Sequence, residues 1–127
     1  MSEHHLNALV GVPYLRGGRD PEVALDCWGL VMVDAECRGL RLPDLDNECP
    51  ATSAAIVRKL ATMATYHATP IAAPTDGCMV YDAKRGHIGL FYGGRVYHAA
   101  NPGGVRCDRL DIWLDFYPGT EYFQWRL

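Results

Sequence analysis

The sequence lacks three features that would each assign it to a particular class of protein. It has no excess of basic residues, since twelve Lys and Arg stand against fifteen Asp and Glu for a formal net charge of −3, so no nucleic-acid partner is expected. No apolar run reaches the roughly 18 residues that span a bilayer. The N-terminus also lacks the basic start and apolar centre of a signal peptide. We therefore expect a soluble chain, made in the cytoplasm without a signal peptide and not inserted in a membrane.

Paired cysteines are also missing. The number of cysteines is odd and no two of them form a CxxC pair, which disfavours both a disulfide framework and a thiolate zinc site. At least one thiol is therefore expected to be free, and most of the others are expected to pack as small buried side chains. The five residues are Cys27, Cys37, Cys49, Cys78 and Cys107.

What is present is enough for one folded domain. The chain has 127 residues, of which 49% are hydrophobic and 21% charged, and these values favour a single packed domain over residues 1–127. The first half shows helical spacing. It predicts a short helix that ends at Gly11, a helix from Cys27 to Leu40 with Asp26 as its N-cap, and a third helix over about residues 52–65.

Beyond Pro70 and Pro74 the pattern changes to short runs rich in β-branched and aromatic residues. Helices followed by strands indicate an α+β fold with an antiparallel sheet, here of about five strands. The predicted strands are Cys78–Tyr81, His87–Tyr92, Arg95–Ala99, Gly104–Cys107 and Glu121–Trp125.

One predicted hairpin brings two histidines together. The pair Gly93-Gly94 between two alternating runs is typical of a two-residue turn, and it sets a register in which Leu90 faces Tyr97. In that register His87 and His98 project from the same face, diagonal to each other. A glycine at position 89 lies between them and leaves room for the two rings to meet. Alternatively, each histidine is an isolated polar residue that bonds to backbone groups.

The thiol of Cys27 is the candidate nucleophile. A free thiol is only about 3% ionised at pH 7, and the thiolate is the attacking species. We expect the N-terminus of the helix and an imidazolium partner to lower the pKa of Cys27, whereas the charge of Asp26 opposes this if it faces the sulfur. Cys37 lies near the helix C-terminus and is expected to be inert.

These residues suggest a mechanism of nucleophilic catalysis. Cys27 would attack a carbonyl carbon, His87 would take and return the proton, and His98 would hold the imidazole of His87 in the productive tautomer. The oxyanion would be bound by the backbone amide of Cys27 and by the hydroxyl of Tyr14. A His/His/Cys zinc site is a weaker alternative, because no acidic residue falls on the same face of the hairpin.

Four segments resemble the successive motifs of the NlpC-type cell-wall cysteine peptidases over about residues 10–125. The resemblance implies a compact papain-like fold and hydrolysis of amide bonds in peptidoglycan stem peptides, commonly between D-γ-glutamate and diaminopimelate, with no metal or other cofactor. By position it implies Cys27 as nucleophile, His87 as base, His98 as orienting residue and Tyr14 as oxyanion or substrate contact. The segments are Tyr14-Leu15-Arg16-Gly17-Gly18, Asp26-Cys27-Trp28-Gly29-Leu30-Val31, Gly86-His87-Ile88-Gly89-Leu90-Phe91 and Tyr97-His98-Ala99.

Trp28 departs from the pattern, because many cell-wall members have Ser after the catalytic Cys. We therefore treat Trp28 as a residue that bears on substrate choice. The segment around it is most similar to the branch found in tail proteins of tailed phages and gene-transfer agents. That branch implies a virion component at the tail tip that opens the cell wall locally as DNA enters, with other tail-tip or hub proteins as partners.

Two other functions stay open. One is a catalytically silent tail-hub or assembly protein that keeps the fold, with Trp28 filling the substrate groove. The other is an acyltransferase or amidase that uses the same thiol. A cluster of aromatic residues near the C-terminus is expected to close the core beneath the sheet, or else to form an interface with neighbouring proteins: Trp113, Phe116, Tyr117, Tyr122, Phe123 and Trp125.

Overall fold

The computed structural model describes residues 4–42 and 68–125 of the chain. The third predicted helix, over about residues 52–65, lies outside the described residues, as does Cys49. The described helices are α1 (His4–Asn7), α2 (Cys27–Cys37) and α4 (Leu110–Phe116). The strands are β1 (Arg19–Asp20), β2 (Ala24–Leu25), β3 (Ala68–Ile71), β4 (Met79–Asp82), β5 (His87–Tyr92), β6 (Arg95–Ala100), β7 (Gly104–Arg109) and β8 (Thr120–Trp125).

The main sheet is antiparallel and confirms the predicted α+β class. Its six strands are ordered β3-β8-β4-β5-β6-β7, and β1 pairs with β2 in a separate ribbon. The five strands expected from the sequence are present, and β3 is an additional one. The sequence pattern missed β3 because Pro70 lies within it. In the structure β3 is an edge strand that pairs only with β8. A proline is tolerated in an edge strand, where only one side of the strand must donate to a neighbour.

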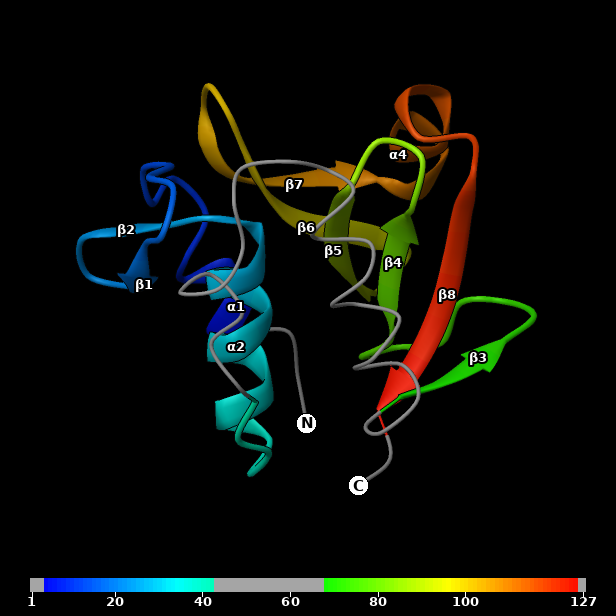
Figure 1. The fold of residues 1–127 in the computed structure, drawn as a ribbon, viewed down its shortest axis with the longest axis horizontal. Helices are drawn as coiled ribbons and strands as arrows, with labels where there is room; N and C mark the ends of the chain where they lie inside the picture. The colour runs from blue at the N-terminus through cyan, green and yellow to red at the C-terminus, as the bar shows by residue number, and fades with distance from the viewer. Residues whose placement is uncertain (1–3, 43–67, 126–127) are drawn as a thin grey trace.

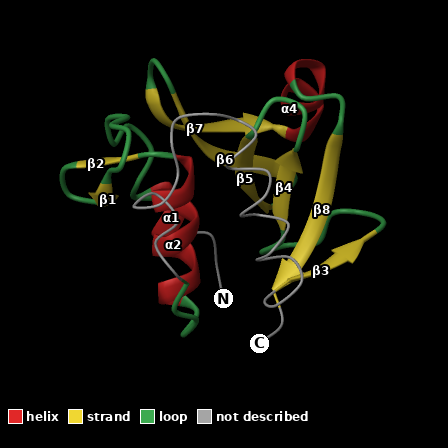
Figure 2. Cartoon of the chain, viewed as in Figure 1, coloured by secondary structure: helices red, strands yellow, loops and turns green. Residues whose placement is uncertain are grey.

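Helices cover both faces of this sheet. Figure 1 shows α2 between the six-stranded sheet and the β1–β2 ribbon, with α4 near the ends of β7 and β8. The secondary-structure colouring of Figure 2 shows the same arrangement of helices and strands. The α2 face of the sheet carries Ile88, Leu90 and Tyr97 in the larger apolar core. The opposite face carries Phe91 and Val96, which pack with Trp113 of α4 in a smaller core.

The register of the central hairpin is the one predicted. Tyr92 pairs with Arg95, and Leu90 pairs with Tyr97. Gly93 and Gly94 have φ values of 60° and 79°, as a tight two-residue turn between right-twisted strands requires. His87 and His98 therefore project from the same face of the sheet as Phe91 and Val96.

Helix α2 begins where the sequence predicts and ends earlier. Its first residue is Cys27, and its last is Cys37 rather than Leu40. The N–H of the C-cap residue, Arg38, bonds back to the carbonyls of Ala35 and Glu36, and Gly39 follows with φ at 82°. A left-handed glycine just past a helix is a common way to end it.

The pattern of the C-terminal aromatics did not predict α4. Seven residues of this segment form the helix, and its Trp113 is 1% exposed whereas Phe116 is 67% exposed. The expectation that these aromatics close the core is therefore confirmed for Trp113 and for Trp125, which is 5% exposed, whereas the exposed Phe116 lies outside the core. Over the described residues, no helix is long and apolar enough to cross a membrane.

Candidate active site

The site is built around the first turn of α2. The side chain of Asp26 caps the helix, with Oδ1 accepting from the backbone N–H of Gly29 at 2.7 Å and Oδ2 accepting from Gly17 N–H at 2.9 Å. Arg19 donates from its guanidinium to Oδ1 of Asp26 at 2.6 Å. Asp26 is 6% exposed, so its charge is buried and is balanced by this arginine. These contacts fix the backbone that carries Cys27.

The loop before α2 packs directly against this turn. A Cβ added at Gly29 would lie 2.2 Å from the carbonyl oxygen of Gly18, a distance that no side chain can occupy. Glycine at position 29 is therefore required for the loop to reach the helix. Tyr14 lies in the same loop, where it forms an isolated bridge with Leu25 and packs against the larger core. The structure thus places Tyr14 near the start of α2.

Cys27 lies where α2 meets the first residues of β5. The backbone N–H groups of Trp28 and Ile88 act on its sulfur and favour the thiolate. Ile88 directly follows His87 in the chain, so the thiol lies next to the strand segment that carries the imidazole. Burial and the charges of Asp82 and Cys27 raise the pKa of Tyr117, whose ring contacts His87. The first turn of α2 and the first residues of β5 therefore lie side by side.

The predicted lowering of the Cys27 pKa is wrong for the protein without substrate. Burial and, to a smaller extent, the charge of Asp26 raise the pKa of the thiol to about 12, although the backbone N–H groups of Trp28 and Ile88 act to lower it. Desolvation disfavours the charged form of any group, and here it outweighs the helix N-terminus. The resting thiol is therefore protonated.

Three side chains form a hydrogen-bonded series that begins at His87. Nε2 of His87 lies 3.0 Å from Nδ1 of His98, and Nε2 of His98 lies 2.8 Å from Oδ2 of Asp108. The predicted meeting of the two imidazole rings is therefore confirmed. A Cβ at Gly89 would lie 2.9 Å from the carbonyl oxygen of Tyr97, so the glycine between the histidines is needed for the strands to approach this closely.

Aromatic rings of α4 and the residue after it hold the imidazole of His87. Trp113 stacks on His87 with ring centroids 5.4 Å apart and an interplanar angle of 25°, and the ring of Tyr117 lies 5.0 Å away. Burial and, to a smaller extent, the nearby His98 lower the pKa of His87 to about 3, although the charge of Asp82 opposes the shift. The resting imidazole is therefore neutral and able to accept a proton.

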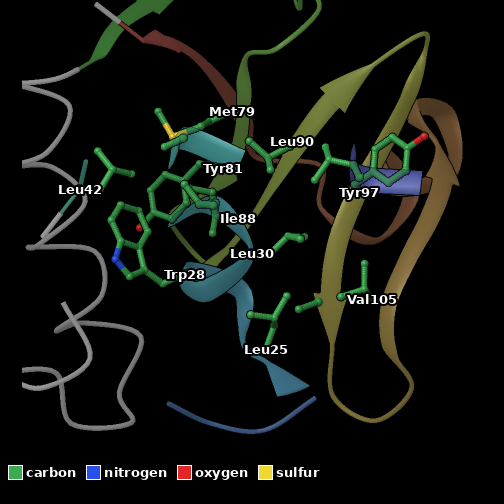
Figure 3. Close-up of a cluster of buried hydrophobic side chains, with 14 of the residues drawn as sticks. Leu25, Trp28, Leu30, Leu42, Met79, Tyr81, Ile88, Leu90, Tyr97 and Val105 are labelled. Carbon is green, nitrogen blue, oxygen red and sulfur yellow. The ribbon is translucent and has the colours of Figure 1, made fainter. Parts of the chain in front are cut away.

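Trp28, the other residue singled out for substrate choice, is a core residue. It is 7% exposed and belongs to the larger apolar core. Figure 3 shows it among Leu42, Tyr81 and Ile88. The hydroxyl of Tyr81 in this cluster is buried and has no hydrogen-bond partner among the described residues. Trp28 thus packs between α2 and the sheet, and this packing does not support the suggestion that it fills a substrate groove.

Asp108 is a site residue that the sequence reasoning missed. It lies on β7, where it pairs with Val96 of β6, while His98 pairs with Arg106. Cross-strand partners share a face of the sheet, so Asp108 is diagonal to His98 on the side away from His87. Its signal in the sequence was the alternation along residues 104–109, which would have placed Asp108 on the histidine face had the β6–β7 register been known.

The remaining cysteines and acids do not extend the site. The described residues contain no group of three or more His, Cys, Asp or Glu side chains that could hold a metal ion. Cys37 is exposed, Cys78 is buried and Cys107 is half-buried, and all are free thiols like Cys27. Burial and the charges of Asp34 and Glu36 raise the pKa of Cys37, in the direction expected for an inert thiol.

Comparisons with known proteins point to one family. The sequence model of the NlpC/P60 family matches residues 11–119. The chain is similar to the NlpC/p60 domain of the peptidoglycan hydrolase SagA, with 19% identity, a TM-score of 0.60, and coverage of 94% of this chain and 92% of that one. No curated protein sequence matches the chain.

A second solved structure is longer than this chain. It is described as similar to a lipoprotein of the NLP/P60 family from Staphylococcus aureus, with 22% identity and a TM-score of 0.61. The match covers 93% of this chain but 38% of that one. At these identities the two structures establish the fold, and they confirm the predicted NlpC-type α+β architecture.

Proposed function

Because the chain belongs to the NlpC/P60 family, we propose that it is a cysteine peptidase that hydrolyses amide bonds in the peptide stems of peptidoglycan. The observation that supports this proposal is a hydrogen-bonded pair of imidazoles on β5 and β6, on a hairpin whose first strand begins beside the thiol at the start of α2. The solved relative SagA is itself named a peptidoglycan hydrolase, which supports the choice of substrate. We assign Cys27 as nucleophile, His87 as base and His98 as the residue that orients His87.

In the first half of the reaction, the sulfur of Cys27 attacks the carbonyl carbon of the scissile amide. The thiol proton passes to His87 as the S–C bond forms, because the resting thiol and imidazole are both neutral. The carbonyl oxygen becomes an oxyanion, for which the backbone N–H of Cys27 and the hydroxyl of Tyr14 are the assigned donors. The C–N bond then breaks, and the leaving amine takes the proton from His87.

Water completes the reaction in the second half. His87 accepts a proton from the water molecule whose oxygen attacks the thioester carbon. The S–C bond breaks, the sulfur recovers the proton, and the carboxylic acid product leaves. Neither half requires a metal or another cofactor, since the thiol supplies the nucleophile and the imidazole carries the proton.

Activity on peptidoglycan tests this proposal directly. Purified protein, Cys27→Ala and the exposed-thiol control Cys37→Ala are incubated with peptidoglycan and with a stem peptide that contains D-γ-glutamyl-diaminopimelate, and products are identified by mass spectrometry. The wild type and Cys37→Ala should cleave the peptide, and Cys27→Ala should not. Equal activity of all three proteins, or none from any, would contradict the proposal and favour a scaffold. Transfer to an added amine rather than to water would indicate an acyltransferase.

We also propose that this peptidase acts in a virion, at the tail tip, together with other tail-tip or hub proteins. The support is the resemblance of Gly17-Gly18-Arg19-Asp20-Pro21 and Asp26-Cys27-Trp28 to the branch found in tailed-phage and gene-transfer-agent tails. In this setting the enzyme is made in the host cytoplasm and reaches the cell wall with the particle. Immunogold labelling of released particles should place the protein at the tail tip, and label confined to other fractions would contradict it.

A further inference from the structure

The carboxylate of Asp108 terminates the hydrogen-bonded chain that starts at His87. Its Oδ2 lies 2.8 Å from Nε2 of His98, and its Oδ1 lies 3.2 Å from a guanidinium nitrogen of Arg106. The His98 side chain is 6% exposed and that of Asp108 is 20% exposed. The contact between them is thus shielded on the imidazole side, while Arg106, at 55% exposed, lies at the surface.

The charge state of Asp108 determines which atom donates in each hydrogen bond of the series His87–His98–Asp108. Burial raises the pKa of Asp108, but hydrogen bonds from His98 and Arg106 outweigh it and hold the pKa below its ordinary value. An ionised carboxylate only accepts hydrogen bonds, so Nε2 of His98 must carry the proton that it donates. Nδ1 of the neutral ring then has a lone pair. It can only accept from Nε2 of His87, which therefore also carries a proton.

These hydrogen-bond directions also determine the protonation of Nδ1 of His87, the nitrogen assigned to accept the thiol proton. With its proton on Nε2, the neutral ring of His87 has a lone pair on Nδ1, and this is the nitrogen that His98 does not contact. We infer that Asp108 is a positioning residue that acts through His98 to keep Nδ1 of His87 unprotonated and available to the thiol of Cys27. The inference rests on the proposed function for its effect on rate, but the tautomers themselves are a property of the folded protein.

Without Asp108 the hydrogen bond between His98 and His87 can reverse its direction. The His87–His98 hydrogen bond persists if Nδ1 of His98 donates to Nε2 of His87. His87 then carries its proton on Nδ1, so this nitrogen cannot accept the proton of the thiol. Asp108→Leu leaves Nε2 of His98 against an apolar side chain, which favours this reversed form. Asp108→Asn keeps an acceptor oxygen without the charge, so the productive form is partly retained.

The experiment measures tautomer and rate in the same set of proteins. Long-range ¹⁵N–¹H NMR of the histidine rings should show a single Nε2–H tautomer for His87 and His98 in the wild type, a mixture with Nδ1–H in Asp108→Leu, and an intermediate result in Asp108→Asn. On a stem peptide, Asp108→Leu should lower kcat by about 10- to 100-fold with little change in KM, as misplacement of a catalytic group does. Asp111→Asn, which alters an exposed carboxylate on α4, serves as the control and should match the wild type.

The outcomes separate this inference from the proposed function. If Asp108→Leu has the wild-type tautomers, the inference is overturned, whatever happens to stability or rate. If the tautomers change while kcat of an active enzyme does not, the positioning role is overturned as well. If the wild type is as inactive as Cys27→Ala, the peptidase proposal fails, and the NMR result still decides whether Asp108 sets the protonation of the two rings.

Discussion

A Cβ placed on Gly89 would lie 3.2 Å from the Cβ of His98, within the hairpin that carries both imidazoles of the site. The same atom would lie 2.8 Å from a methyl group of Val96 and 2.9 Å from a backbone oxygen of Tyr97. Strands β5 and β6 can approach closely enough for the His87–His98 hydrogen bond only because this position has no side chain. Glycine is therefore part of the site although it has no chemistry of its own.

Gly89→Ala should destabilise the protein and separate the two rings. Overpacking of a tight site costs about 1–3 kcal/mol, and the free energy of unfolding in urea measures it. Loss of activity should exceed what the change in folded fraction explains, because His98 moves relative to His87. Gly119→Ala is the matched control, since its added Cβ would meet Asp82 at an ordinary contact distance of 3.4 Å. Equal stability of the two variants would contradict this reading of Gly89.

The buried imidazole of His87 predicts how stability depends on pH. Its pKa of about 3 when folded lies below the ordinary value of about 6.5 that it has when unfolded. Between these values the unfolded state binds more protons, so the free energy of unfolding falls as pH falls below about 6.5, with a limiting slope of about 1.4 kcal/mol per pH unit for one proton. The stabilising effect is fully present above pH 6.5.

Urea unfolding of the wild type and of His87→Gln at several values between pH 5 and 6.5 checks this dependence. In that range most carboxylates stay ionised in both states, so the histidines dominate the slope. In the His87→Gln variant, the slope of the free energy of unfolding against pH should be smaller by nearly the amount that one proton contributes. His98, whose pKa burial also lowers, contributes in the same direction and keeps part of it. Parallel curves for the two proteins would show that His87 is not buried in its neutral form.

Asp26 both positions Cys27 and opposes its ionisation. Asp26→Asn keeps an oxygen that can accept from Gly29 N–H, but it removes the charge that raises the pKa of Cys27. The thiol pKa should fall, and alkylation of Cys27 by iodoacetamide at fixed pH, followed by mass spectrometry, should become severalfold faster. Loss of the ion pair with Arg19 should cost about 2 kcal/mol of stability. The rate at Cys37 is the internal control, and unchanged labelling of Cys27 would refute the electrostatic role of Asp26.

A second buried carboxylate stabilises the fold on the side away from the active site. Asp34 is fully buried on α2, where its Oδ1 lies 2.6 Å from Nε2 of His5 and accepts from the hydroxyl of Tyr92 at 2.9 Å, while its Oδ2 lies 3.2 Å from Arg38. Asp34→Ala leaves these partners without their shared acceptor and should lower the free energy of unfolding by about 3–5 kcal/mol. Asp115→Ala, at an exposed position, should cause a much smaller change. A small change in both variants, measured by urea unfolding, would contradict the role of Asp34.

Local patterns were sufficient for much of the fold and for half of the site. Asp26 before an apolar-periodic run predicted where α2 begins, and the Gly93-Gly94 pair predicted the register of β5 against β6. The meeting of His87 and His98 follows from that register alone. Such predictions succeed because an N-cap and a two-residue turn depend on residues within a few positions of each other.

Other features depend on partners far away in the chain. The sequence pattern missed strand β3 because Pro70 argues against a strand unless that strand lies at the edge of the sheet. The position of β3 at the edge follows from its pairing with β8, which is far away in the chain. The helix α4 was missed because its seven residues carry no side-chain cap at Arg109, and its apolar residues face a sheet that must already exist. The burial that determines the pKa of Cys27 likewise comes from packing against β5.

The amino-acid sequence by itself determines that a cysteine opens a helix, that two histidines share one face of a hairpin, and that helices precede an antiparallel sheet. Only the tertiary structure decides that Asp108 of β7 completes the chain behind His98, that Trp28 packs in the core, and that the thiol and His87 rest as neutral groups. The physical reason is the separation along the chain between the residues that interact. Hydrogen-bonded turns and caps are encoded by neighbours in the chain, whereas desolvation and cross-sheet contacts are set by residues that only folding brings together.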